Sequence, residues 1–247
     1  MELKTLVKRT REVGTSAGVL LPRKWLNKQV VVTLAPHSKE DISESVLKIL
    51  FNQKLNEEIK GIYLFGSYAR NEQDFDSDID ILVITEKINK IISQEGYEIL
   101  LVSEETLQKN LSNNLFYQSI LNEIKVIINK ELIKKYSVKK YESDFRKNLL
   151  EIKKILKINK ENISICEEIG KNVPDGIVYS VVLRLRELYL IKAIHSKITY
   201  SKKEFIKIIG EKVYSAYIRI KRDERELNTL YPKEIKKLLD LSEKWQD

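Results

Sequence analysis

Two short motifs decide the fold of this chain: Gly66-Ser67-Tyr68-Ala69-Arg70 and, after seven further residues, Asp78-Ile79-Asp80-Ile81-Leu82-Val83. Alternate side chains of a β-strand lie on the same face, so Asp78 and Asp80 are predicted to face one space together. Two carboxylates about 6 Å apart beside an apolar core raise the pKa of at least one of them unless a cation is bound. Mg²⁺ suits such a pair, because it prefers hard oxygen ligands and keeps positions open for water and phosphate oxygens. The Asp-x-Asp motif therefore predicts a divalent-metal site.

The Gly-Ser pair predicts the other half of the same site. It directly follows the apolar run 61–65, which is typical of a buried strand. Glycine lets a backbone approach a ligand closely, and serine adds a hydroxyl, so a turn between a strand and a helix can bind phosphate oxygens. A strand, a Gly-Ser turn, a helix and an Asp-x-Asp strand in this order predict a site for a polyphosphate bridged by metal ions.

The chain around these motifs has the pattern of a small α/β layer. Apolar spacing predicts a helix over 40–59, strands at 61–65, 79–84, 97–102 and 125–128, and helices near 87–94, 104–110 and 114–122. Beyond about residue 138, Leu, Ile, Lys and Glu dominate; one helix is predicted from Pro174-Asp175 to His195, and a capping box at Ser201 begins another. The predicted fold class is α+β, with a small β unit at 1–36, a central α/β domain with a mixed sheet at 37–137 and a helical bundle at 138–247.

The first 36 residues alternate β-branched runs with turn signals, which predicts small strands near 3–9, 19–22 and 29–35. A unit of this size cannot bury a core alone, so it must pack on the rest of the chain or on a second copy. Its glycine turn at 14–18, Leu-Pro run at 19–22 and Val-rich end at 29–32 resemble the AbrB-like swapped-hairpin family. The resemblance implies a short helical turn at about 23–27, between the Leu-Pro run and the Val-rich end. It also implies an interleaved homodimer that, in many relatives, binds DNA. Dimerisation without DNA is the alternative; the candidate DNA contacts within residues 8–24 are Lys8, Arg9, Arg11, Arg23 and Lys24.

Charge is distributed unevenly along the 247 residues, whose formal net charge is +8. It is +5 over residues 1–36, −5 over 37–137 and +8 over 138–247. This pattern fits a metal-collecting centre between flanks that hold a polyanion, and it also fits solvated lysine-rich helices. The longest uncharged stretch has 13 residues, too few to span a bilayer, and the first residues lack the apolar core of a secretory signal. We therefore expect a cytoplasmic protein without membrane contact.

The segments 66–70 and 77–81 together resemble the polymerase-β-like nucleotidyltransferase superfamily, in particular its minimal, MNT-type branch, over about residues 40–136. The resemblance implies transfer of a nucleoside monophosphate, usually from ATP, to an acceptor hydroxyl, with pyrophosphate leaving. It implies that two Mg²⁺ ions lie on Asp78 and Asp80, within a motif that begins at Ser77. It further implies phosphate contacts from Gly66 and Ser67, and a loop- or nucleotide-holding role for Arg70.

Catalytic relatives usually add a third carboxylate, which binds the metal beside the attacking hydroxyl and can take its proton. The matching strand offers Glu98, whose alternative role is a solvent-facing strand end. The basic flanks favour RNA or protein over a small drug as the acceptor. A rival interpretation is a DNA-binding transcriptional regulator or an antitoxin, with a core that senses a nucleotide and catalyses weakly.

The helical segment carries two arginines, Arg184 and Arg186, inside an apolar helix. A buried guanidinium needs an anionic partner. Glu187 lies three residues from Arg184 and is predicted to pair with it, whereas Arg186 could instead meet the substrate. Further on, rings and positive charges interleave, which fits either nucleic-acid contact or an amphipathic helix; these residues are Tyr214, Tyr217, Arg219, Lys221 and Arg222.

Overall fold

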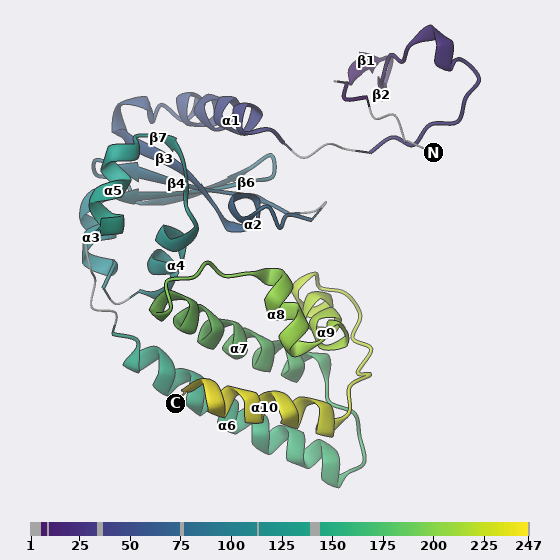
Figure 1. The fold of residues 1–247 in the computed structure, drawn as a ribbon, viewed down its shortest axis with the longest axis vertical. Helices are drawn as coiled ribbons and strands as arrows, with labels where there is room; N and C mark the ends of the chain where they lie inside the picture. The colour runs from purple at the N-terminus through teal and green to yellow at the C-terminus, as the bar shows by residue number, and fades with distance from the viewer. Residues whose placement is uncertain are drawn as a thin grey trace. The chain divides into compact units, whose positions relative to one another are not determined.

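The computed structural model describes residues 6–8, 10–33, 37–74, 77–112, 114–138 and 144–246. The chain forms two compact units, residues 1–48 and 49–247, and each is described by itself (Figure 1). The predicted domain boundary after residue 36 falls at residues 34–36, which lie outside the described residues. The three-domain division therefore stays a prediction.

The first unit contains a short hairpin, in which β1 (Arg11–Val13) pairs antiparallel with β2 (Ser16–Gly18). A 3₁₀ turn, η1 (Arg23–Trp25), confirms the predicted helical turn. The predicted strands at 19–22 and 29–33 are wrong for the single chain: neither segment is a strand, and of the predicted 3–9 strand only 6–8 are described, also without a strand. A strand requires hydrogen bonds to a partner strand, and the side chain of Val31 is 94% exposed here.

Helix α1 (Lys39–Asn52) follows and ends seven residues before the predicted end at 59. Lys54 adopts a φ of 57°, which is incompatible with a continuing helix, and a 3₁₀ turn, η2 (Asn56–Glu58), leads into the sheet.

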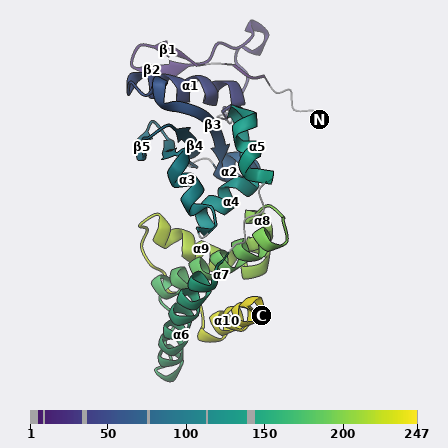
Figure 2. The ribbon, with the colours of Figure 1, turned by 90° about the vertical axis from the view of Figure 1, so that its left-hand side faces the viewer.

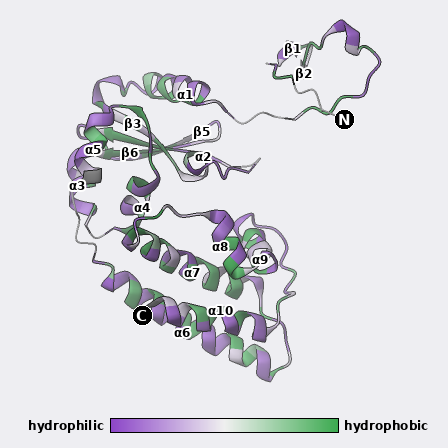
Figure 3. Cartoon of the chain, in the orientation of Figure 1, coloured by the Kyte–Doolittle hydropathy of each residue, from purple (hydrophilic) through white to green (hydrophobic). Residues whose placement is uncertain are grey.

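The second unit is built on a five-stranded mixed sheet in the order β5-β6-β4-β3-β7. Strands β4 and β6 run parallel, and every other neighbouring pair is antiparallel. The four predicted strands are confirmed as β3 (Ile59–Phe65), β4 (Ile79–Thr85), β6 (Tyr97–Ser103) and β7 (Lys125–Ile128). Hydrophobic residues concentrate in the central strands (Figure 3).

The helix predicted at 87–94 is wrong, because this segment forms the edge strand β5 (Lys90–Gln94). Glu95 and Gly96 both adopt positive φ, which makes a tight turn, and β5 then pairs with β6 as a hairpin. Burial alternates along the strand, since Ile92 is buried while Ile91 is exposed. The two adjacent isoleucines fit both the two-residue period of a strand and the 3.6-residue period of a helix. The tight turn after them decides in favour of the strand.

Three helices cover one face of the sheet: α3 (Glu104–Asn110), α4 (Leu115–Glu123) and α5 (Lys130–Val138). Leu82 and Ile84 of β4 lie in the core between this face and the helices, as do Tyr63 and Phe65 of β3. The strand alternation therefore places Asp80 on the helix-covered face, at the end where the apolar core stops.

The remaining helices form the predicted bundle: α6 (Arg146–Glu168), α7 (Asp175–His195), α8 (Lys202–Ile209), α9 (Glu211–Lys221) and α10 (Pro232–Gln246). Helix α7 is central and contributes buried residues along its whole length, and α6, α9 and α10 pack against it (Figure 2). The predicted cap is confirmed, since the Ser201 hydroxyl accepts a hydrogen bond from the Glu204 amide at 3.3 Å.

The fold class is thus α+β, with a small N-terminal hairpin, a mixed sheet and a helical bundle. Among the described residues, none of the helices combines the length and the hydropathy that crossing a membrane requires. The cytoplasmic location stays a prediction.

Candidate active site

The Gly-Ser turn connects β3 directly to the five-residue helix α2 (Gly66–Arg70). Gly66 has a φ of 72°, and a Cβ atom built on it would lie 1.9 Å from Oδ2 of Asp80. A glycine is required here for two reasons: the backbone conformation disfavours other residues, and the Asp80 carboxylate occupies the space that a side chain would need. The turn and the Asp-x-Asp motif are therefore in direct contact.

Strand pairing brings Asp80 and Glu98 side by side. Asp80 is paired with Phe65 on one neighbouring strand and with Glu98 on the other, parallel strand. Paired residues of adjacent strands project on the same face, so both carboxylates lie on the helix-covered face of the sheet. Asp78 precedes β4 and is exposed, as is Glu98, whereas Asp80 is partly buried.

The electrostatics single out Asp80. Burial raises its pKa to about 6, and the negative charges of Glu98, Asp78 and Glu123 act in the same direction, while Arg70 opposes them. Several carboxylates therefore repel the partly buried Asp80 carboxylate. A cation bound beside Asp80 would stabilise its charged form.

All seven predicted site residues line one cavity of about 990 Å³. Its sheet side includes Gly66, Ser67, Arg70, Ser77, Asp78, Asp80 and Glu98. Its opposite side comes from the helical bundle, chiefly from α7, α8 and α9. Ser77 has a local structural role as well, because its hydroxyl accepts a hydrogen bond from the Asp74 amide at 2.8 Å.

Arg70 is held by two carboxylates that the sequence motifs do not include. Its Nε lies 3.1 Å from Glu72 and its Nη1 lies 2.5 Å from Glu123. The other carboxylate oxygen of Glu123 accepts a hydrogen bond from the Gly66 amide at 2.8 Å. Glu123 thereby connects the Gly-Ser turn to the arginine that closes the short helix.

The sequence motifs do not include Glu123, although its position at a helix end indicates a special environment. Glu123 is the last residue of α4, and the helix dipole destabilises a negative charge at a helix C-terminus. Such a residue needs another source of stabilisation, which Arg70 and the Gly66 amide supply. Glu72 was missed as well, and nothing in the sequence indicates its partners on α8, because they lie about 130 residues away.

The donor chemistry of the cavity fits a divalent cation. Among the described residues, no three or more His, Cys, Asp or Glu side chains are already grouped so that they could hold a metal ion. Asp80 and Glu98 nevertheless share one face beside Asp78, and carboxylate oxygens are the hard ligands that Mg²⁺ prefers. The exposed Asp78 and Glu98 side chains have room to turn toward an ion near Asp80.

On the bundle side, the predicted ion pair is confirmed: Arg184 lies 3.2 Å from Glu187. Arg186 forms no ion pair with Glu187, although the charge of Glu187 acts on it, and it lines the cavity together with Tyr200, Tyr214 and Tyr217.

The chain belongs to the nucleotidyltransferase domain family, whose model matches residues 45–229. A protein of Methanocaldococcus jannaschii named "Putative protein adenylyltransferase MJ0126" is 36% identical over 88 residues, which make up 34% of this chain and 90% of that protein. The crystal structure of a nucleotidyltransferase-like protein from Exiguobacterium sibiricum covers 83% of this chain and 74% of its own, at 14% identity and a TM-score of 0.35. The chain is thus an enzyme that transfers a nucleoside monophosphate from a nucleoside triphosphate, of the EC 2.7.7 type.

Proposed function

We propose that the chain is an MNT-type nucleotidyltransferase that transfers AMP from ATP to a hydroxyl group on RNA or protein and releases pyrophosphate. The placement of Asp80 carries this proposal, since it is in register with Glu98 and in contact with the Gly-Ser turn. The relative named as a protein adenylyltransferase supports AMP as the transferred group and a protein among the acceptors.

Asp78, Asp80 and Glu98 are the residues that would hold two Mg²⁺ ions. Bound ions would supply positive charge for the oxygens that enter and leave phosphorus. Gly66 and Ser67 face the β- and γ-phosphates, and Glu123 with Arg70 keeps their turn in place. The Glu98 carboxylate accepts the proton of the acceptor hydroxyl while that oxygen forms its bond to the α-phosphorus and the bond to the departing pyrophosphate breaks.

The test uses the full chain with α-³²P-labelled ATP, Mg²⁺ and separate RNA and protein fractions of a cell extract. Wild type is expected to label one fraction and to release pyrophosphate, and Asp78→Asn and Asp80→Asn are expected to abolish both. Asp240→Asn, an exposed acid on α10, is the matched control and keeps wild-type activity. Unchanged transfer by both active-site variants contradicts the proposed roles.

A second proposal concerns the first unit, which we take to be an AbrB-like homodimerisation unit that contacts DNA. A 3₁₀ turn lies where the resemblance implies a helical turn, and the basic side chains of Lys8, Arg11, Arg23 and Lys24 are exposed; Arg9 lies outside the described residues. The affinity of the full chain for operator DNA distinguishes a regulator from an enzyme. A regulator keeps this affinity in a double variant that combines Asp78→Asn with Asp80→Asn. It loses the affinity when the four exposed basic residues become Gln.

A further inference from the structure

Arg186 is a partly buried cation that has no direct ion-pair partner among the described residues. It lies on α7 and lines the cavity, and its Nε is buried without a hydrogen-bond partner. Within the part of the chain that the structure describes, Arg186 forms no ion pair with a carboxylate; the negative charge of Glu187 acts on it, but Glu187 forms its ion pair with Arg184. Taking a charge out of water without an ion-pair partner costs several kcal/mol, roughly, so an anion that pairs with Arg186 would offset that cost.

The side chains that contact Arg186 are neutral tyrosines, and one negative charge, that of Glu187, acts on it from the same helix. Its guanidinium lies 5.4 Å from the centre of the Tyr200 ring and is hydrogen-bonded to Tyr217, and Tyr214 also interacts with it. Burial raises the pKa of Tyr200 to about 12 and also raises that of Tyr214. These phenols are therefore protonated at neutral pH and cannot neutralise the cation.

Arg70 provides the internal comparison. It lies 5.1 Å from the centre of the same Tyr200 ring, but Glu72 and Glu123 both neutralise it. Of the two guanidinium groups beside Tyr200, only Arg186 remains available to an anion that enters the cavity. The cavity has most of its carboxylates on its sheet side, and on its bundle side it has Arg186, a cation that is not in an ion pair.

The surroundings of Arg186 indicate which anion it binds. The phosphate-binding turn lies on the sheet side, whereas α9 extends the bundle side with Tyr214 and the exposed Lys221. Rings interleaved with cations bind single-stranded nucleic acids, whose bases stack and whose phosphates pair with positive charge. An unmodified polypeptide acceptor offers no comparable repeat of planar groups and phosphates.

We propose that Arg186 binds a backbone phosphate of a single-stranded RNA acceptor whose terminal hydroxyl points across the cavity toward Asp80. This inference rests on the proposed function, since it names the acceptor of that reaction. Arg186 is then a residue that determines acceptor specificity, and Tyr200 orients its guanidinium.

The first test measures binding without catalysis. A short fluorescent single-stranded oligoribonucleotide is titrated with the full chain at several salt concentrations. Arg186→Met is expected to weaken binding about tenfold or more, and to reduce the slope of log affinity against log salt by about 0.7, the value for one phosphate contact on a single strand. Arg186→Lys keeps that slope, and the exposed Arg146→Gln on α6 serves as the control.

Thermal unfolding separates recognition from a structural role. Arg186 has no ion pair to lose, and its replacement by an apolar side chain of similar length removes a partly buried charge, so the melting temperature of Arg186→Met is expected to equal or exceed that of wild type. A lower melting temperature together with unchanged RNA affinity overturns the inference.

Steady-state kinetics identify the source of the phosphate. Arg186→Met is expected to raise KM for RNA while leaving KM for ATP within about twofold. If only the KM for ATP rises, Arg186 binds the triphosphate. If protein but not RNA is labelled, RNA is not the acceptor. Either result overturns the inference. If wild type transfers nothing but Arg186→Met still loses RNA affinity, the anion site stands and the proposed reaction fails.

Discussion

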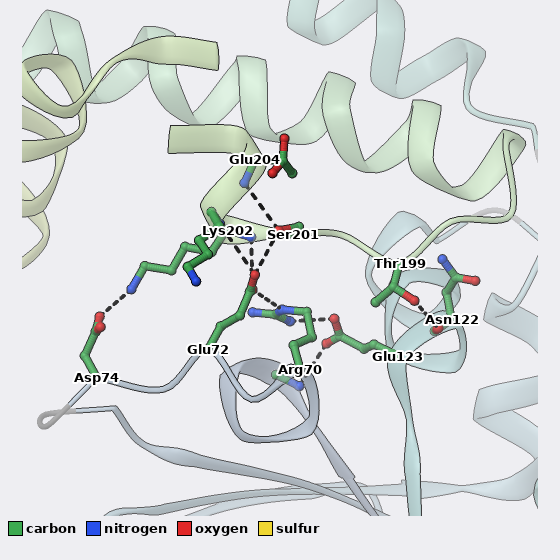
Figure 4. Close-up of polar contacts among 11 residues, drawn as sticks. Arg70, Glu72, Asp74, Asn122, Glu123, Thr199, Ser201, Lys202 and Glu204 are labelled. Atoms are coloured by element: carbon green, nitrogen blue, oxygen red, sulfur yellow. Dashed lines mark hydrogen bonds and ion pairs between the residues drawn. The ribbon is translucent and has the colours of Figure 1, made fainter. Parts of the chain in front are cut away.

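The carboxylate of Glu72 accepts a hydrogen bond from the backbone amide of Lys202 at 2.9 Å, although 130 residues separate the two in the chain. Its other oxygen accepts one from the Ser201 hydroxyl, also at 2.9 Å. An acidic side chain at a helix N-terminus satisfies amides that the helix leaves unpaired. Because Glu72 also binds Arg70, it joins the Gly-Ser turn on one side of the cavity to helix α8 on the other (Figure 4).

Glu72→Gln is expected to lower the free energy of unfolding by about 1–3 kcal/mol at neutral pH, because buried charge-assisted hydrogen bonds are lost. Burial acts to raise the pKa of Glu72, but hydrogen bonds from Lys202, Arg70 and Ser201 outweigh it and lower the pKa. The stabilisation is therefore present above the unfolded-state pKa and disappears as the pH falls through the lower folded-state value. Denaturant titrations from pH 7 to pH 3 should show the variant converging on wild type.

The matched control for Glu72 is Glu204→Gln on α8. Its side chain pairs with Lys207 on the surface, so little change is expected. Equal losses in the two variants would show that Glu72 does not connect the turn to α8.

Gly66→Ala is expected to abolish transfer and to lower the free energy of unfolding by about 1–3 kcal/mol. The added Cβ meets the Asp80 carboxylate and the φ of 72° is strained. Gly96→Ala is the control that contains the backbone strain alone, because Gly96 has a φ of 78° but nothing lies within 4 Å of a Cβ atom built on it. Activity assays and denaturant titrations of both variants test this prediction. If Gly66→Ala were as active as Gly96→Ala, the contact between residue 66 and Asp80 would be unimportant for transfer.

Asp80→Asn is expected to stabilise the ligand-free chain while it abolishes transfer. The folded-state pKa of Asp80 is raised to about 6 from an ordinary value of 3.8. Above pH 6 the charged group therefore destabilises the folded state, and this cost fades as the pH falls from 6 toward 4. Melting temperatures should show a gain for the variant at pH 8 and none at pH 4; a constant gain would contradict an electrostatic origin.

Glu98→Gln is expected to reduce the transfer rate about 10²- to 10⁴-fold, the usual contribution of a positioned general base. ATP binding measured by calorimetry should persist, because the Gly-Ser turn and Asp80 are unchanged. The control is Glu95→Gln, an exposed acid in the β5–β6 turn outside the cavity lining. A wild-type rate for Glu98→Gln would leave this residue as a solvent-facing strand end.

Val31→Asp is expected to convert a dimer to a monomer in sedimentation experiments at micromolar concentration. Val31 and Val32 are 94% and 74% exposed in the single chain, so a second copy would cover apolar surface there. Ile169→Asp is the control, because this residue is also apolar and 57% exposed but lies in the helical bundle. If both variants sediment as wild type does, the first unit is not the dimer interface.

Several elements could be predicted from local patterns alone. The strand and turn at 61–67, the Asp-x-Asp strand and the helix from Asp175 to His195 all follow from short-range spacing. The errors arose where a distant partner decides the structure. Residues 90–94, within the segment predicted as a helix, form a hairpin strand because β6 is available to pair with them, and residues 29–33 have no strand because the single chain offers them no partner.

The order of residues determined that a glycine turn and two alternating carboxylates would follow buried strands, because side-chain direction along a strand depends only on local geometry. Only the tertiary structure decided that Glu98 lies in register with Asp80, that Glu123 and Glu72 hold Arg70, and that the Nε of Arg186 is buried without a hydrogen-bond partner. These relationships join residues from separate strands and helices. Strand register, helix packing and charge compensation depend on the whole fold, which no short stretch of sequence specifies.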